Sequence, residues 1–298
     1  MDVTKGGRFV SVIEDSVESR VALIQRIQTH LTSKFAVFCG KDTDDNYYDS
    51  IEEFWRHHGF LDKETIVTMW YKSSKEYWET EDNVPATIDG MLGGWSILSE
   101  PDLAASKQFL QEVINLRPQL SERIKSDQET RACECGAGIG RLTKGLLLPI
   151  GLKTSDLVET SPRLLEAAPQ YLGRDALKCR FHCAGLQNFN MPENTYDVIW
   201  IQWVIAYITD WDFVNFLSRM KRSLREGGII VIKDNTCSDL AFFSDTSDTD
   251  ITRSYRYLRA LIEESGLSVL KDDNGKELVK WQDDFPDDIW PTPMIALE

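Results

Sequence analysis

A glycine-rich turn between two predicted strands constrains this chain more than any other feature. The turn reads Cys-Gly-Ala-Gly-Ile-Gly-Arg over 135–141 and follows a predicted strand at 131–134. About twenty residues further on, a second predicted strand, 156–159, ends on Glu159. Glycines let the backbone approach a ligand closely, and an acid that ends the second strand can bind a ribose. The pattern therefore predicts a nucleotide or nucleoside site on a parallel sheet.

The spacing of the glycines bears on the kind of ligand. The turn has the pattern G-x-G-x-G, whereas the dinucleotide fingerprint G-x-G-x-x-G places its third glycine for a pyrophosphate and a helix N-terminus. We therefore favour S-adenosylmethionine, which carries no pyrophosphate. On the turn alone, a nicotinamide or flavin site and a purely structural tight turn stay open as alternatives.

Strands and helices are predicted to alternate after the first third of the chain. Helices are expected at 211–224 and 251–264, each followed by a glycine that can end it. This order predicts an α/β fold with a doubly wound, seven-stranded, Rossmann-like sheet of the methyltransferase type, whose ligands lie outside the carboxyl ends of the strands. The expected strands are 131–134, 156–159, 180–183, 197–201, 229–233, 267–271 and 294–297.

The sequence before this alternation divides at about residue 65. We expect 1–65 to form a helical N-terminal extension and 66–298 to form the methyltransferase-like domain. Apolar residues recur at helical spacing from residue 15, a polar loop covers 41–46, and a second helix is expected at 48–58. Further helices are expected at 66–79 and from Ser99 to about residue 116, where Ser99 and Asp102 resemble a capping box. No catalytic pattern is evident in the extension.

Composition excludes several classes of partner. The formal net charge of −15 disfavours nucleic acid, because a protein that neutralises phosphates needs a basic face. No apolar run reaches membrane length and the N-terminus lacks the apolar core of a signal peptide, so a cytoplasmic protein is expected, with the nucleus as a second compartment. The six cysteines and four histidines show no ligand spacing, so no metal is expected. The oligomeric state is left open.

Several longer segments carry a more specific resemblance. They read Asp-Gly-Met-Leu-Gly-Gly at 89–94, Leu-Leu-Leu-Pro at 146–149, Trp-Ile-Gln-Trp-Val at 200–204 and Ile-Val-Ile-Lys-Asp-Asn at 230–235. Together with the glycine turn, they resemble the α-N-terminal protein methyltransferases over about 66–298. The resemblance implies transfer of methyl groups from S-adenosylmethionine to the α-amino group of proteins that begin, after removal of the initiator methionine, with X-Pro-Lys or X-Pro-Arg.

The resemblance assigns cofactor contacts to the glycine turn and to the strand ends that follow it. Arg141 matches a residue that can bind the methionine carboxylate as a bidentate pair. Glu159 matches the ribose acid; the family usually has Asp there, so Glu159 reaches one methylene further. The implied cofactor set is Gly136, Gly138, Arg141, Glu159, Ser161, Leu186, Gln187 and Gln202.

The substrate side of the resemblance centres on a pair of acids. An α-amino group has a pKa of about 7.7–8.0, so a weak base suffices to make it a neutral nucleophile. Asp245 and Asp248 match the family's paired acids, which can hold the ammonium and accept its proton, and Asn235 matches the residue that fixes the substrate backbone. Tyr207 stands where the family commonly has a histidine. Because tyrosine titrates near 10, we expect Asp248 to carry more of the proton transfer.

Aromatic residues are expected around the incoming peptide, since their flat faces can hold a proline ring or a methylated cation. Taken singly, each tryptophan could equally be a core residue. Two other functions stay open: a small-molecule amine methyltransferase, and a catalytically weak S-adenosylmethionine-binding protein. The implied substrate-binding set is Trp78, Met91, Leu92, Gly93, Trp95, Trp203 and Trp290.

Overall fold

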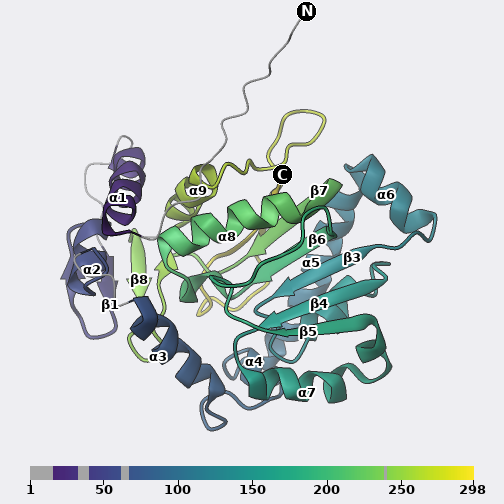
Figure 1. Ribbon diagram of the computed structural model, residues 1–298, viewed down its shortest axis with the longest axis horizontal. Helices are drawn as coiled ribbons and strands as arrows, with labels where there is room; N and C mark the ends of the chain where they lie inside the picture. Colours follow the sequence, from purple (N-terminus) through teal and green to yellow (C-terminus); the bar gives the residue numbers. More distant parts are fainter. Residues whose placement is uncertain (1–15, 33–39, 62–66, 238–239) are drawn as a thin grey trace, which may run out of the picture.

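A seven-stranded sheet forms the centre of the computed structural model, which describes residues 16–32, 40–61, 67–237 and 240–298 (Figure 1). Its strand order is β10-β11-β7-β6-β3-β4-β5. The five strands from β7 to β5 run parallel, and β11 runs antiparallel to both of its neighbours. The predicted doubly wound α/β sheet is thus confirmed. Its strands are β3 (Arg131–Cys135), β4 (Thr154–Glu159), β5 (Cys179–Cys183), β6 (Tyr196–Gln202), β7 (Leu224–Lys233), β10 (Val279–Gln282) and β11 (Thr292–Leu297).

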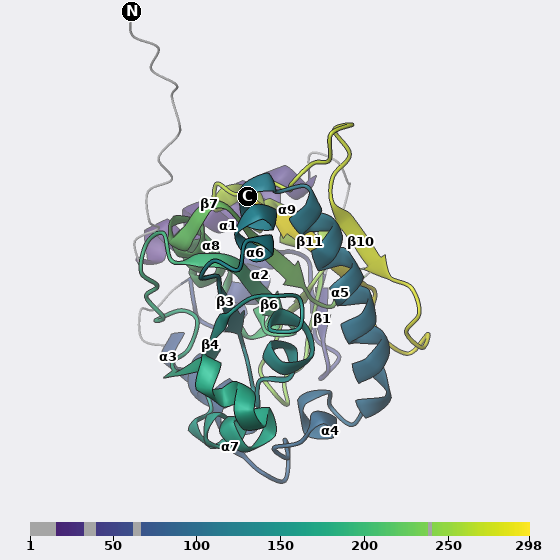
Figure 2. The ribbon, with the colours of Figure 1, turned by 90° about the vertical axis from the view of Figure 1, so that its right-hand side faces the viewer.

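Helices cover both faces of the sheet, and this explains its apolar strands. All residues of β6 are buried: Ile199 and Ile201 pack in one core cluster, and Val198 and Trp200 pack in another. In Figure 1, α8 lies in front of the sheet and α5 behind it, and Figure 2 shows α5 running along β10 and β11. The α-helices are α1 (Val17–Thr32), α2 (Ile51–His57), α3 (Val67–Glu79), α4 (Ile88–Met91), α5 (Ser99–Asn115), α6 (Pro118–Lys125), α7 (Pro162–Leu172), α8 (Asp210–Ser223) and α9 (Tyr255–Glu264). Segments of 3₁₀- or π-helix are η1 (Ser96–Leu98), η2 (Thr143–Leu147), η3 (Gly173–Lys178) and η4 (Ile205–Tyr207).

Two predictions near the C-terminus are wrong. The segment 267–271 is no strand, because Val269 and Lys271 make only isolated bridges, and β10 takes the edge of the sheet instead. The helix expected at 251–264 begins only at Tyr255, where the Ser254 hydroxyl accepts the amide N–H of Tyr257. The residues just before it form β9 (Thr252–Arg253), which pairs with β8 (Phe242–Ser244).

The capping box expected at the start of α5 is also wrong. The structure gives α5 no side-chain cap at its N-terminus. The Asp102 side chain is instead fully buried and forms an ion pair with Arg141, at 2.7 Å between Oδ2 and Nη2. The sequence pattern suggested a local hydrogen bond, but the carboxylate is used in a tertiary contact.

The described part of the N-terminal extension adds strands to the expected helices. Strand β1 (Gly40–Asp42) pairs with β2 (Tyr47–Tyr48) and, in parallel, with β8, so that a second sheet has the order β2-β1-β8-β9. Because β2 occupies the start of the expected helix 48–58, α2 begins only after Ser50. The proposed domain boundary at residues 65 and 66 lies outside the described residues.

This second sheet fastens the extension to the loop that follows β8. We call residues 245–251 the acidic loop. The hydroxyl of Thr43 accepts the backbone N–H of Thr246 at 3.0 Å and lies 2.9 Å from the Thr246 hydroxyl, and the Thr43 N–H donates to the Ser244 carbonyl at 3.0 Å. The extension therefore supports the loop that carries Asp245 and Asp248.

Candidate active site

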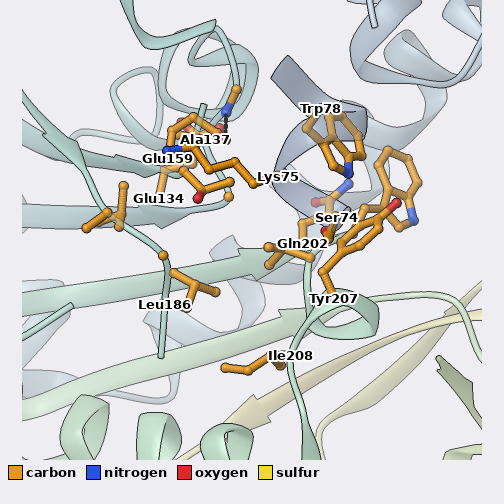
Figure 3. A pocket seen from close by; sticks show the side chains of 18 of the residues that line it. Ser74, Lys75, Trp78, Glu134, Ala137, Glu159, Leu186, Gln202, Tyr207 and Ile208 are labelled. Atoms are coloured by element: carbon orange, nitrogen blue, oxygen red, sulfur yellow. Dashed lines mark hydrogen bonds between the residues drawn. The ribbon is translucent and has the colours of Figure 1, made fainter. Parts of the chain in front are cut away.

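A cavity lies at the carboxyl ends of β3, β4 and β6, between the glycine turn and α3. It contains about 970 Å³ of empty space, part of which is open to solvent, and this is room for a ligand of nucleoside size. In Figure 3, Glu134, Glu159 and Leu186 lie on one side of the cavity, and Trp78 and Tyr207 lie on the other. The residues predicted from the sequence that line it are Gly136, Gly138, Arg141, Glu159, Leu186, Gln187, Gln202, Trp78, Met91, Trp203 and Tyr207.

The glycine turn needs its glycines for both conformation and space. Gly136 and Gly138 have φ angles of +69° and +52°, a region that side-chain-bearing residues rarely adopt. A Cβ atom on Gly136 would lie 2.7 Å from Cβ of Val204, and one on Gly138 would lie 2.3 Å from the sulfur of Met91. The turn thus brings the backbone to the cavity wall, as the sequence pattern predicted.

Glu159 joins the glycine turn to the end of β4. Its Oε2 accepts the N–H of Gly138 at 2.8 Å, and its Oε1 accepts the N–H of Ser161 at 2.8 Å. Each carboxylate oxygen has a second lone pair, so the acid can still accept ribose hydroxyls. Burial raises the pKa of Glu159. Ser161 does not line the cavity; its hydroxyl caps α7 through the N–H of Leu164.

Arg141 and Gln202 are held from behind by Asp102. The Asp102 carboxylate accepts Arg141 Nη2 at 2.7 Å and Gln202 Nε2 at 2.8 Å. The Gln202 side-chain oxygen Oε1 accepts the indole N–H of Trp200 at 2.8 Å. Arg141 Nη1 is buried and has no hydrogen-bond partner within the described residues. A buried guanidinium nitrogen without a partner can bind a ligand carboxylate in the cavity.

Tyr207 lines the opposite end of the cavity and pairs with Asp248, which lies outside the lining. The Tyr207 hydroxyl donates to Asp248 Oδ2 at 2.8 Å, while Oδ1 of Asp248 is buried and has no hydrogen-bond partner in the described parts of the chain. Burial raises the pKa of Asp248 to about 6; the Tyr207 hydrogen bond lowers it and the nearby charge of Asp245 raises it. Burial also raises the pKa of Tyr207. Trp78 packs edge-on against Tyr207, with ring centroids 5.5 Å apart.

Asn235 and Trp203 form a supporting contact beside the cavity. The Asn235 side-chain oxygen accepts the indole N–H of Trp203 at 3.2 Å and the hydroxyl of Thr292 at 2.9 Å. Trp203 has a φ of +50°, which is unusual for a bulky residue and marks stored backbone strain of the kind found at functional sites. Asp245 accepts the backbone N–H and hydroxyl of Ser247, so its Oδ1 shapes the acidic loop.

The structure does not bring every predicted residue into the cavity. Trp95 and Trp290 are each 39% exposed, and open space surrounds the Cβ position of Gly93. Such residues can contact only a ligand that extends beyond the cavity. The predicted site residues outside its lining are Ser161, Leu92, Gly93, Trp95, Asn235, Asp245, Asp248 and Trp290.

Several residues of the cavity were not predicted from the sequence. Tyr71, Ser74 and Lys75 line it from α3, and Lys75 extends toward Glu159 in Figure 3. Glu134, the residue directly before the turn, accepts the backbone N–H groups of Leu142 and Thr143. Burial raises the pKa of Glu134 to about 7. The position of Glu134 directly before the glycine turn was a sequence signal for its place in the cavity. Asp102, which contacts Arg141 and Gln202 from outside the lining, was predicted only as part of a capping box.

These features fit S-adenosylmethionine. The buried Arg141 nitrogen suits its carboxylate, Glu159 suits the ribose hydroxyls, and Leu186 offers an apolar contact for adenine.

In the ranges that the structure describes, no three His, Cys, Asp or Glu side chains gather as a metal site would require. None of the helices in those ranges has the length and apolar content needed to cross a bilayer.

The sheet order and this cavity define a class I S-adenosylmethionine-dependent methyltransferase. The chain belongs to the family described as AdoMet dependent proline di-methyltransferase, which it matches over residues 67–298. It is 44% identical to N-terminal Xaa-Pro-Lys N-methyltransferase 1-B of Xenopus laevis over 231 residues, 77% of this chain and 96% of that protein. It is 38% identical to alpha N-terminal protein methyltransferase 1 of Dictyostelium discoideum over 265 residues, 87% of this chain and 90% of that protein.

A solved structure supports the same assignment. A SAM-dependent methyltransferase from Leishmania major superposes with a TM-score of 0.73 and 34% identity, over 88% of this chain and 96% of that one. Phosphoethanolamine N-methyltransferase 1 of Haemonchus contortus, solved with S-adenosylhomocysteine, has a TM-score of 0.54 at 16% identity, over 77% of this chain and 49% of that one, and so shares the fold alone. The Leishmania structure, at 34% identity, agrees with S-adenosylmethionine as the methyl donor.

Proposed function

We propose that this enzyme transfers methyl groups from S-adenosylmethionine to the α-amino group of proteins with an exposed X-Pro-Lys or X-Pro-Arg N-terminus. The observation that carries the proposal is the hydrogen bond to Asp248 from Tyr207, which lines one end of a cavity whose other end suits the cofactor. The names of the Xenopus and Dictyostelium relatives support a protein N-terminus, rather than a small amine, as the acceptor.

The cofactor end of the site is assigned to the turn and strand-end residues. When bound, the cofactor supplies an electrophilic methyl group on a sulfonium. Arg141 holds the carboxylate end, Glu159 accepts the ribose hydroxyls, and Leu186 with Gln187 flanks the adenine. Gly136 and Gly138 let the backbone approach, Gln202 lines the wall, and Ser161 keeps Glu159 in place through its N–H.

The proton of the α-ammonium is assigned to Asp248. Its Oδ1 is a buried acceptor without a partner among the described residues, and its raised pKa of about 6 lies nearer to that of an α-amino group than the usual aspartate value does. Tyr207 stays protonated because burial raises its pKa, so it donates to Asp248 and cannot act as the base. Asp245 adds negative charge for the ammonium, and Asn235 fixes the substrate backbone.

The peptide is assigned to the aromatic and apolar residues around the cavity mouth. Trp78, Met91 and Trp203 line the cavity and contact the first residues of the peptide. Leu92, Gly93, Trp95 and Trp290 lie outside the cavity lining, so they contact later residues of the peptide.

A peptide that begins Ser-Pro-Lys should gain whole methyl groups at its N-terminus, measured by mass spectrometry after incubation with enzyme and S-adenosylmethionine. A matched peptide with Glu for Lys at position three should show no measurable turnover, because the acidic loop repels it. The affinity for the Lys peptide should fall as salt is added, since exposed charge pairs are screened. Equal rates on both peptides would refute charge recognition, and turnover of small amines only would refute the proposed substrate class.

The extension should also affect peptide binding, through Thr43. Thr43→Val removes two contacts to Thr246 and should raise the KM for the peptide about two- to fivefold, the scale of one or two exposed hydrogen bonds. The KM for S-adenosylmethionine should not change, because the cofactor end is remote from β1. Thr43→Ser keeps the hydroxyl and serves as the control. An unchanged peptide KM in Thr43→Val would show that this contact does not position the acidic loop.

We assign the enzyme to the cytoplasm, with the nucleus as a second compartment, because newly made protein N-termini first become available in the cytoplasm. Nucleic acid is not proposed as a partner, given the net charge of −15. Fractionation of cells that express the tagged chain tests the compartment.

A further inference from the structure

The carboxylate of Asp102 lies at the centre of a buried polar network behind the cofactor end of the cavity. It is fully buried and does not line the cavity. Its Oδ2 accepts Arg141 Nη2 at 2.7 Å, and its Oδ1 accepts Gln202 Nε2 at 2.8 Å and Lys233 Nζ at 2.5 Å. One carboxylate on α5 therefore holds two residues that we assign to the cofactor site.

Lys233 gives this network a second cation. Its side chain is fully buried, and its Nζ also donates to the Ser106 hydroxyl at 2.9 Å and to the Gln282 side-chain oxygen at 2.6 Å. Asp102 thus contacts two cations, while the charges of Asp284 and Glu134 act on Lys233 and Arg141 respectively. Within this network, Nη1 of Arg141 has no hydrogen-bond partner among the described residues, and Arg141 lines the cavity. This nitrogen is a donor available to an anionic group bound in the cavity.

The orientation of Arg141 depends on Asp102. A guanidinium has its donors in a fixed plane, so a hydrogen bond at Nη2 sets the direction of Nη1. The indole ring of Trp203 packs on the Arg141 guanidinium, at 5.6 Å from its centre, and limits its rotation further. Held in this way, Nη1 needs little reorganisation to bind a carboxylate.

We propose that Asp102 is a positioning residue for the amino-acid end of the cofactor, acting through Arg141 and Gln202. The inference rests on the proposed role of Arg141 as the carboxylate ligand. It assigns no ligand contact to Asp102, and it predicts that Asp102 matters only for ligands that carry the amino-acid carboxylate.

Replacing Asp102 by asparagine tests this. A neutral amide has one acceptor oxygen, so Arg141 and Lys233 can no longer both be satisfied. Calorimetry should show a loss of about 10- to 100-fold in S-adenosylhomocysteine affinity, the range for charge-assisted hydrogen bonds. Affinity for 5′-methylthioadenosine, which lacks the amino-acid end, should change by less than about threefold. Asp102→Glu keeps the charge and, if Asp102→Asn does not fold, should show the same selectivity with a smaller loss.

Asp197→Asn is the matched control. Asp197 is also a fully buried carboxylate with two arginine partners, Arg123 at 2.8 Å and Arg225 at 3.1 Å, but it lies near the amino end of β6, away from the cavity. Its loss should lower the melting temperature without changing either ligand's affinity. Equal losses for both ligands in the Asp102 variants, or unchanged S-adenosylhomocysteine affinity, would overturn the inference.

Arg141→Ala separates this inference from the proposed function. If Arg141→Ala weakens S-adenosylhomocysteine binding and Asp102→Asn does not, Asp102 has no positioning role and the cofactor assignment stands. If Arg141→Ala also leaves the affinity unchanged, the carboxylate assignment of Arg141 falls, and the Asp102 inference falls with it.

Discussion

Replacing Asp248 by asparagine should lower kcat by about 10²–10⁴, the usual contribution of a general base. Asparagine keeps the size of the side chain and can still accept the Tyr207 hydroxyl, but it cannot take a proton from the substrate ammonium. The buried position of Oδ1 leaves little room for water to replace it. Initial rates at saturating peptide and S-adenosylmethionine, followed by mass spectrometry, measure the change.

Tyr207→Phe is the matched control for Asp248→Asn, and the pH dependence distinguishes their roles. Asp248 must be ionised to accept a proton, so the wild-type rate should fall as pH drops through about 6. The Tyr207 hydrogen bond lowers the Asp248 pKa, so Tyr207→Phe should move this acid limb to higher pH and change the rate little above it. Tyr207→His should preserve or raise activity. A Tyr207→Phe variant as inactive as Asp248→Asn would make the phenol essential to the proton path.

The contact between the glycine turn and Glu159 was predictable because its determinants are local. In a doubly wound sheet, residues that end neighbouring parallel strands meet at one edge. The turn after β3 and Glu159 at the end of β4 therefore had to converge, and the structure places Glu159 2.8 Å from the N–H of Gly138. Both determinants lie within one strand–turn–strand stretch of the sequence, between β3 and the end of β4.

The other features of the fold and of the site depend on contacts that the spacing of residues in the sequence does not encode. The pattern Ser99-x-x-Asp102 resembles a capping box, and nothing near it signals the ion pair with Arg141, 39 residues away. Strand β1 pairs with β8, which lies far away in the sequence. Helical periodicity alone therefore predicted the helices of the extension but not its strands. Trp290 is exposed because of the path that the chain takes between β10 and β11. Local sequence propensity does not determine this path.

Gly136→Asp should weaken S-adenosylhomocysteine binding by at least about 2 kcal/mol, close to 30-fold in affinity. An added Cβ would lie 2.7 Å from Val204 Cβ, so the turn or the wall of the cavity must move. The new carboxylate would also carry negative charge next to the place assigned to the cofactor's own carboxylate. Isothermal titration calorimetry measures the change directly.

Gly275→Asp provides the control for backbone strain. Gly275 has a φ of +81°, close to the +69° of Gly136, but no atom lies within 4 Å of its Cβ position, and it is outside the cavity lining. Both substitutions place a side chain at positive φ, which costs about 1 kcal/mol of stability. Only Gly136→Asp should also weaken ligand binding, because only Gly136 lies at the cavity wall. If both variants bind S-adenosylhomocysteine like the wild type, the proposal that the turn lies close to the cofactor is wrong.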